Sequence, residues 1–266
     1  MSTTVQGLAT GWGVDTSDDD NLFLRFVRNQ GDMSAALAIA CDGRAAGTEG
    51  VVLTDTGGPV GYLNQAVLQR PINGADDPVL DQIDDFWAGE FGRANLLFSI
   101  WPTPDLARRG WSLVGHPALV ARAPGAHIQA RPPGVEVQEV RDTDALAKVE
   151  RVVIEGYPLP EAGGRPPGDL LRVGLLDTDL RCRLGLLDGE PVASAAQFTA
   201  HGVVNLCLAA TLPAARRRGV WGALVWARVD DHPELPAMAF TSDFSRPGFE
   251  HLGFLVVSRC TLWARA

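Results

Sequence analysis

The order of predicted strands and helices in the second half of the chain restricts its possible folds more than any other sequence feature. Residues 135–140 (VEVQEV) alternate apolar and polar side chains, as a half-buried strand does. Residues 142–157 then carry apolar side chains at helical spacing, with Asp142 or Thr143 as the N-cap. Residues 180–213 read as three strands with turns at Asp188-Gly189 and His201-Gly202, because an Asp-Gly pair between apolar runs is a hairpin signal.

The remaining segments complete an α/β unit. They are a loop at 161–168, a short helix at 169–176, a helix at 214–231, a strand at 236–243, a short helix at 246–252 and a final strand at 254–265. The resulting order, β-α-α-β-β-β-α-β-α-β, predicts a mixed sheet that is mostly antiparallel and flanked by helices.

A proline- and glycine-rich segment at 121–137 separates this unit from the first half of the chain. We therefore predict two domains, 1–128 and 129–266. In the first, strands are expected at 51–55, 62–69 and 95–101, and an amphipathic helix at 77–91. Residues 110–122 and 253–265 share glycine, aromatic, apolar and Ala-Arg positions at a constant offset, which suggests a duplicated terminal hairpin and two related α/β units in tandem.

The composition is that of a folded chain with an acidic surface. Hydrophobic residues make up 46% and charged residues 21%, a balance that supports a buried core. The formal net charge of −9 argues against partners such as nucleic acid or an anionic membrane and favours a small cationic one. Residues 1–20 lack the pattern of a secretory leader, and no stretch approaches the ~18 apolar residues of a membrane span. We expect a cytoplasmic protein, either monomer or homodimer.

The four cysteines give no sign of a metal or disulfide site. They are widely spaced and form no C-x-x-C pair; they are Cys41, Cys182, Cys207 and Cys260. We expect buried thiols and no bound metal.

The stretch RRRGVWGAL, Arg216 to Leu224, predicts an anion site. It follows a strand and begins a helix, where unpaired N–H groups and the positive end of the helix dipole favour phosphate. Gly219 and Gly222 allow close approach because neither has a Cβ. The stretch matches neither the Walker pattern nor the dinucleotide pattern.

The longer stretch TLPAARRRGVWGAL resembles motif A of the GNAT superfamily of acyl-CoA-dependent N-acyltransferases. That motif reads [QR]-x-x-G-x-[GA] and follows a strand-end proline, here Pro213. Trp221 departs from it by standing at the usual glycine or alanine position. The stretch SDFSRPGFEHLGF is similar to the family's motif B, N-x-x-[AS]-x-x-x-Y-x-x-x-G-F, with Ser242 at the asparagine and Phe249 at the tyrosine position.

The resemblance covers residues 135–266 and implies a splayed strand pair that holds pantetheine, with acetyl-CoA or another acyl-CoA as co-substrate. The residues it implies for coenzyme binding are Ala209, Ala210, Thr211, Arg216, Arg217, Arg218, Gly219, Val220, Trp221, Gly222, Ser245 and Phe249. At the matching place the first half has LQRPINGADDPVLDQI, which lacks the motif. The first half therefore resembles the degenerate half of tandem members; it either walls the acceptor cleft or only adds stability.

Candidates for acid–base chemistry are few, because Phe249 has no ionisable proton and the strand before motif A carries Asn205 but no carboxylate. Glu155 and Tyr157 lie where the family often places acceptor-binding residues, and Ser242 can support proton transfer by hydrogen bonding. Asp243 could face the cleft, although its stronger interpretation is the N-cap of the helix at 246–252. Cys207 is interpreted as a buried strand residue, not a nucleophile.

These observations predict direct acyl transfer from acyl-CoA to the amine of a small, cationic acceptor. Two alternatives stay open: a non-catalytic acyl-CoA sensor, motivated by Phe249, and a thioester hydrolase with the same fold.

Overall fold

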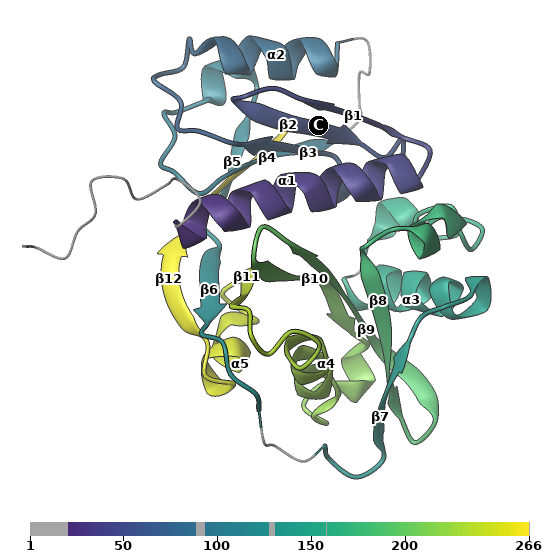
Figure 1. Cartoon of the computed structure of the whole chain (residues 1–266). Helices are drawn as coiled ribbons and strands as arrows, with labels where there is room; N and C mark the ends of the chain where they lie inside the picture. The colour runs from purple at the N-terminus through teal and green to yellow at the C-terminus, as the bar shows by residue number, and fades with distance from the viewer. Residues whose placement is uncertain (1–20, 89–93, 128–130, 158, 266) are drawn as a thin grey trace, which may run out of the picture.

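Two β-sheets make up the protein, one above the other in Figure 1, and helix α1 (Leu22–Ala40) lies between them. This computed structural model describes residues 21–88, 94–127, 131–157 and 159–265. Below, the first half means the described residues up to 127 and the second half those from 131. None of the described helices is long and apolar enough to cross a membrane.

The first sheet has six strands, with α2 (Pro78–Phe86) packed on one face and α1 on the other. In spatial order the strands are β1 (Arg44–Gly47), β2 (Val51–Asp55), β3 (Gln65–Leu68), β4 (Asn95–Ser99), β13 (Thr261–Arg265) and β5 (Ser112–Gly115). Neighbours are antiparallel except β3 and β4, which are parallel. Asp77 caps α2 by accepting a hydrogen bond from the Val79 amide, and Pro78 occupies the first turn, where its missing N–H costs nothing.

The second sheet has seven strands. In spatial order they are β12 (Leu255–Arg259), β6 (Ala118–Arg122), β11 (Ala237–Thr241), β10 (Val203–Thr211), β9 (Glu190–Ala200), β8 (Arg181–Leu187) and β7 (Val135–Glu139). Only β10 and β11 are parallel. Helix α3 (Thr143–Gly156) packs on the face that α1 also covers, while α4 (Val220–Val229) and α5 (Arg246–His251) cover the opposite face.

The two halves exchange a strand. β6, from the first half, pairs with β11 and β12 of the second sheet. β13, from the second half, pairs with β4 and β5 of the first sheet. The two similar segments at 110–122 and 253–265 thus take equivalent places in the two sheets, but neither pairs with itself as a hairpin. Each half therefore supplies strands to both sheets, and no single point in the sequence separates the residues of one sheet from those of the other. The boundary at 128/129 stays a prediction.

A buried polar network ties α1 to both sheets. Asn29, fully buried, donates to the carbonyls of Phe198, Ala200 and Val203. The Gln30 side chain accepts from Asn205 of β10 at 2.9 Å and donates to Gln65 of β3 at 3.0 Å. Because these bonds satisfy polar groups that burial removes from water, they fix how the two sheets sit on each other.

Most of the predicted elements of the second half are confirmed, including both turns between β8, β9 and β10. The short helix expected at 169–176 is a 3-10 helix at Val173–Asp177. The final strand expected at 254–265 is interrupted at Cys260, where the chain passes from one sheet to the other. In the first half, the strand expected at 62–69 starts only at Gln65, because Gly61–Leu63 form a 3-10 turn. Part of the helix expected at 77–91 lies outside the described residues.

Candidate functional site

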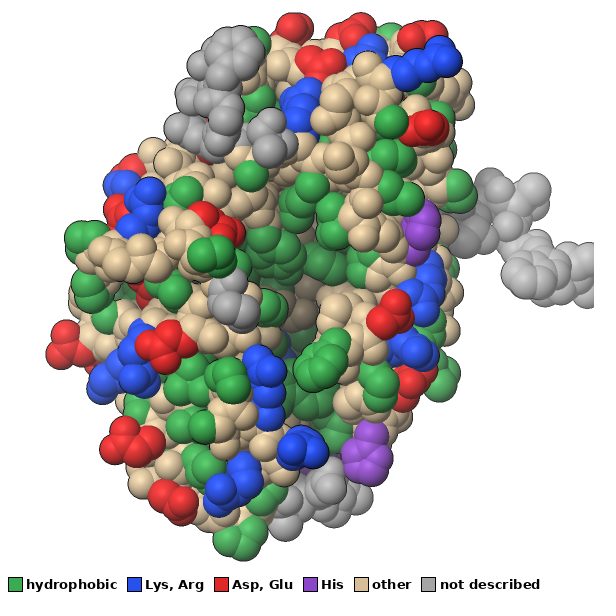
Figure 2. Space-filling model, turned by 180° about the vertical axis from the view of Figure 1, so that it is seen from behind, with side chains coloured by type: hydrophobic (Ala, Val, Ile, Leu, Met, Phe, Trp, Pro, Cys, Tyr) green, Lys and Arg blue, Asp and Glu red, His purple; other side chains and the backbone are tan. Residues whose placement is uncertain are grey.

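A cleft of about 1810 Å³ lies between the two halves of the protein. In Figure 2 it is a hollow with hydrophobic side chains in its depth and basic side chains along its lower rim. Residues from β10, α4, α5 and the end of α3 line it, together with Val60, Tyr62, Leu63 and the turn after β5. Since a pocket for one drug-sized ligand measures roughly 300–1,000 Å³, this cleft can hold a large molecule or two molecules together.

Strand β10 carries a β-bulge at the floor of the cleft. Cys207 pairs with Ala196 and Ala210 pairs with Ser194, so two residues of β10 oppose one residue of β9. Leu208 within the bulge has φ +47, a left-handed conformation that non-glycine residues rarely adopt. Such strain is maintained only where the surrounding structure enforces it, which makes the bulge a candidate functional feature.

Beside the bulge, β10 and β11 separate. Their parallel pairing consists of Val204 with Ala237 and Asn205 with Met238, after which the strands diverge. The facing backbone edges beyond Asn205 therefore have room for an extended ligand between them. This is the splayed strand pair that the motif resemblance implies, and Ala209, Ala210 and Thr211 line the cleft along it.

The first turn of α4 lines the same cleft. Its first amides have no partner within the helix. Gly219 is the N-cap residue with φ +82, and a Cβ there would come within 2.6 Å of Pro132 Cγ. Only glycine fits this position without strain. Arg217, also left-handed with φ +62, lines the cleft together with Gly219 and Gly222.

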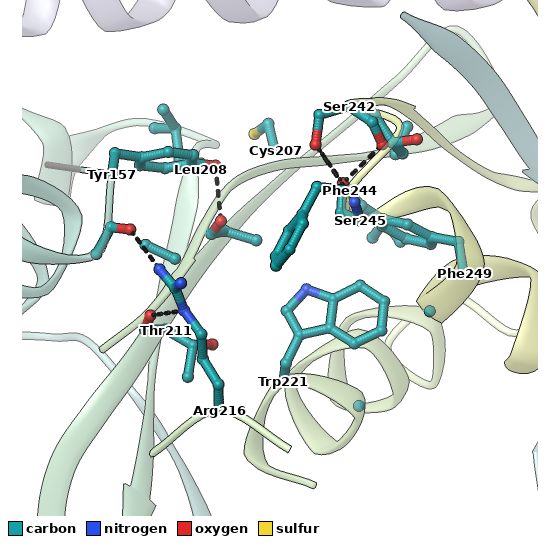
Figure 3. Close-up of a pocket in the computed structure, with 18 of the residues that line it drawn as sticks. Tyr157, Cys207, Leu208, Thr211, Arg216, Trp221, Ser242, Phe244, Ser245 and Phe249 are labelled. Atoms are coloured by element: carbon teal, nitrogen blue, oxygen red, sulfur yellow. Dashed lines mark hydrogen bonds between the residues drawn. The ribbon is translucent and has the colours of Figure 1, made fainter. Parts of the chain in front are cut away.

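The three arginines before Gly219 differ in their contacts. Arg216 donates to the carbonyls of Thr211 at 3.3 Å and Gly156 at 3.1 Å, which braces the end of α3 against β10 (Figure 3). Arg217 is exposed on the cleft wall, whereas Arg218 is exposed but does not line the cleft.

Trp221 packs against α5. Its ring lies edge-to-face with Phe249, with centroids 4.8 Å apart, and covers Gly248, where a Cβ would come within 3.0 Å of the ring. Phe249 is 5% exposed and also contacts Phe254, so the residue at the motif B tyrosine position belongs to the core. Phe244, by contrast, is 84% exposed, and Figure 3 shows its ring pointing into the pocket on the side of Trp221.

The polar residues of the motif B loop bind one another. The hydroxyl oxygens of Ser242 and Ser245 lie 3.1 Å apart, and the Ser245 amide donates to the Ser242 hydroxyl. Asp243 lines the cleft, but the interpretation of Asp243 as the N-cap of α5 is wrong. Its carboxylate pairs with Arg259 at 3.0 Å and with Arg246 at 3.4 Å, and hydrogen bonding to Arg259 lowers the pKa of Asp243.

The two acid–base candidates at the end of α3 lie apart. Tyr157 lines the cleft and donates its hydroxyl proton to the carbonyl of Ala209 at 2.6 Å, directly at the bulge. Desolvation raises the pKa of Tyr157 to about 12, so its hydroxyl stays protonated and can act only as a donor or relay. Glu155 is exposed and does not line the cleft, so the structure does not bring it to the site.

The cysteines are buried thiols, as predicted. Cys207 lines the cleft beside the bulge, where burial raises its pKa to about 12 although the nearby Arg228 cation lowers it. A thiol with this pKa is not a nucleophile at neutral pH.

Tyr62 is the cleft residue that sequence reasoning missed. It lies in the 3-10 turn Gly61–Leu63 of the first half, and its ring centroid is 6.1 Å from that of Phe240 on β11. Burial raises the pKa of Tyr62 well above its ordinary value, and the neighbouring Tyr157 and Cys207 add to the effect. The one hint in the sequence was that tyrosine is rare, since Tyr62 is one of only two tyrosines in the chain. The first half therefore does line the cleft, one of the two roles expected for it.

In the first half, a carboxylate occupies the position that corresponds to the α4 anion site. Asp77, at the turn between β3 and α2, accepts bonds from the amides of Asn73 and Val79 and from the guanidinium of Arg70. Hydrogen bonding to Arg70 holds the pKa of Asp77 well below its usual value. The protein's own carboxylate therefore satisfies amides at this helix N-terminus.

The comparisons with known proteins find likeness in structure alone. No family model matches the sequence, and no curated protein does. A GCN5-related N-acetyltransferase from Kribbella flavida matches with a TM-score of 0.60 at 19% identity, over 88% of this chain and 95% of that chain. A GNAT family protein from Novosphingobium aromaticivorans matches with a TM-score of 0.55 at 14% identity, over 87% and 96% of the two chains.

A GCN5-related N-acetyltransferase from Sphaerobacter thermophilus matches with a TM-score of 0.51 at 14% identity, over 91% of this chain and 93% of that chain. Each of these matches covers most of this chain and most of the matched chain. The structural likeness therefore includes the first half as well as the second half, which carries the motifs. With its two mostly antiparallel sheets in tandem, the chain has the fold of the GNAT superfamily.

Proposed function

We propose that this protein is an acyl-CoA-dependent N-acyltransferase that transfers an acyl group, most simply acetyl, to the amine of a small molecule. The observation that carries the proposal is the meeting of two features in one cleft. The strands β10 and β11 diverge beside a strained bulge, and the N-terminus of α4 presents free amides a short distance along the same cleft. The fold shared with GCN5-related N-acetyltransferases adds support.

The described residues fit an acyl-CoA molecule. The diphosphate would bind the backbone amides between Arg217 and Gly222, which the helix dipole and the glycines favour. The pantetheine amides would pair with the unpaired edge of β10 at Ala209 to Thr211. Trp221 and Phe244 offer apolar surface to the rest of the coenzyme.

The chemistry proposed is direct transfer without a covalent enzyme intermediate. Attack of the amine on the thioester carbonyl places negative charge on oxygen, and backbone N–H groups held at the bulge would stabilise it. Holding both substrates in one cleft supplies much of the remaining acceleration. The raised pKa of Cys207 argues against an acyl-cysteine intermediate.

One observation favours a second function, a non-catalytic acyl-CoA sensor. The motif B position that usually supplies the acid is Phe249, which is packed between Trp221 and Phe254 and has no proton to donate. A sensor needs the coenzyme contacts but not this acid.

Release of free thiol from acetyl-CoA separates the functions. Thiol release that depends on an added amine supports transfer, release without amine supports a thioester hydrolase, and tight acetyl-CoA binding with neither supports a sensor. Absence of acetyl-CoA binding by calorimetry would contradict all three.

The coenzyme site itself is tested by Gly222→Glu. The new carboxylate stands in the first turn of α4, where it favours the helix but repels a diphosphate. We expect the Kd of Gly222→Glu for acetyl-CoA to exceed that of the neutral and equally large Gly222→Gln by about tenfold or more, because the two variants differ only in charge. Equal Kd values for the two variants would contradict binding of the diphosphate at α4.

A further inference from the structure

The cleft has an apolar end on the side of the first half. We call it the inner chamber and define it by six lining residues: Val60, Tyr62, Leu63, Leu159, Cys207 and Phe240. Val60, Leu63 and Cys207 belong to one buried cluster against which Tyr62 and Leu159 pack, and the Phe240 ring packs on that of Tyr62 at a tilt of 45°. Cys207 places the chamber beside the bulge.

The inner chamber offers no negative charge to a ligand. Among the described residues, the cleft-lining carboxylates are Asp230 and Asp243. Asp230 is paired with His127 at 2.8 Å, and Asp243 with Arg259 and Arg246. The histidines His116 and His251 line the cleft and are exposed, and the arginines that line it are Arg131, Arg216 and Arg217.

This lining disfavours a cationic acceptor. An alkylammonium ion has a pKa of about 10, so at neutral pH it would enter charged, lose its hydration without a carboxylate partner and still need a base. A weakly basic aromatic amine is uncharged at neutral pH, carries an apolar body and can attack without prior deprotonation. Its properties complement the chamber, where a phenol is the polar group that reaches in from the first half.

Resting on the function proposed above, we propose that the acceptor is a weakly basic aromatic amine whose ring occupies the inner chamber, with the Tyr62 hydroxyl hydrogen-bonded at the reacting atoms. No described residue hydrogen-bonds to that hydroxyl, although Tyr62 lines the cleft, so it is available to a bound molecule. Tyr157 differs, since its hydroxyl is engaged by the Ala209 carbonyl.

The step is balanced without any ionised side chain. The amine nitrogen attacks the thioester carbonyl carbon, a C–N bond forms, the C–S bond breaks, and the thiol leaves with one proton. The Tyr62 oxygen accepts the proton that the nitrogen loses and donates its own proton to the sulfur. Its raised pKa suits this relay, because the phenol begins and ends neutral.

The acceptor class is tested with two isomers, p-toluidine, uncharged at pH 7, and benzylamine, charged at pH 7. With acetyl-CoA and the whole protein, and after subtraction of the rate without protein, we expect kcat/KM for p-toluidine to exceed that for benzylamine by about tenfold or more. It should also change little between pH 7 and 9. Faster use of benzylamine or of a polyamine would overturn this inference and leave the proposed function standing. Thiol release with no amine at all would overturn the proposed function itself.

The role of Tyr62 is tested with Tyr62→Phe, which keeps the ring that packs on Phe240. We expect kcat with p-toluidine to fall by about 100-fold, with the Kd for acetyl-CoA and the midpoint of thermal unfolding unchanged. Tyr157→Phe is the matched comparison, because it removes a hydroxyl at the bulge and should alter acetyl-CoA binding instead. A kcat for Tyr62→Phe within twofold of the original protein would remove Tyr62 from the reaction.

Discussion

At the scale of single residues, the two halves differ in what satisfies the equivalent helix N-terminus. In the second half the first turn of α4 lines the cleft and has no side-chain cap, while in the first half Asp77 caps α2 with a carboxylate that is 3% exposed. Its partner Arg70 is 39% exposed, so water screens part of the attraction between them. The absence of the glycine-rich motif from LQRPINGADDPVLDQI predicts that this half does not bind the coenzyme, and the carboxylate that caps its helix is visible only in three dimensions.

Asp77 should make stability depend on pH in the acid range. Because its folded pKa is depressed below the unfolded value of about 3.9, its contribution is complete above about pH 5 and is lost as pH falls below about 4. Asp77→Asn keeps an N-cap but removes the charge, so we expect a loss of about 1–3 kcal/mol of unfolding free energy at pH 7. Urea unfolding from pH 3.5 to 7 should show the loss shrinking toward the acid end.

Asp76→Asn is the control for this change, because the neighbouring Asp76 is exposed. A loss caused by Asp77→Asn that stayed constant down to pH 3.5 would contradict the assigned role of the Asp77 charge.

At the scale of elements, α3 shows how far a sequence pattern reaches. Its spacing was predictable and is confirmed, and of the two N-caps that the sequence allowed, Asp142 and Thr143, the structure has Asp142. Its buried Glu150 gave no signal, since a carboxylate on a helix is usually exposed. Glu150 accepts hydrogen bonds from the amides of Gly168, Leu170 and Leu171, and so fastens the segment that follows the loop at 161–168.

Glu150→Gln should destabilise the protein by about 1–3 kcal/mol, because the amide NH₂ would face backbone donors and leave them unsatisfied. Glu155→Gln on the same helix is exposed and should change stability by less than about 0.5 kcal/mol. Chemical denaturation of both variants measures the difference. Equal effects would show that the Glu150 bonds do not hold this segment in solution.

Other elements could not be predicted because their contacts are made by residues far apart in the sequence. Helix α1 was missed because its buried face includes polar residues, Asn29, Gln30 and Ser34, which interrupt the apolar stripe of an amphipathic helix. These residues form hydrogen bonds in the interface between the sheets. The α4 turn was predictable because its glycine and strand-to-helix position have a local physical cause. The approach of Tyr62 to β11, by contrast, arises from tertiary structure alone.

At the scale of the whole molecule, the strand exchange makes each sheet depend on the other half of the chain. β6 lies between β11 and β12, and β13 lies between β4 and β5. Removal of either half would leave an unpaired gap inside a sheet, where backbone groups lose their hydrogen bonds. The division into 1–128 and 129–266 therefore describes the sequence better than it describes folding.

The full chain should unfold in a single cooperative transition, and a fragment of residues 129–266 should show none. Tryptophan fluorescence reports on both parts, since Trp87 and Trp263 lie in the core of the first sheet and Trp221 packs beside α5. We expect its transition to coincide with that of far-ultraviolet circular dichroism. Two separate transitions, or a folded fragment, would show that the halves are independent.

The strand exchange also determines when each sheet can be completed during synthesis of the chain. The ribosome completes β4 and β5 long before it reaches Thr261, so the first sheet stays open between them until β13 emerges. If the first half folds early, the edges of β4 and β5 that later pair with β13 stay unpaired. They could then pair with non-native strands, including strands from neighbouring nascent chains. A message truncated before β13 would yield a protein that keeps the residues of α4 and β10 proposed to bind the coenzyme, yet lacks the cleft-lining Leu262 and a closed first sheet.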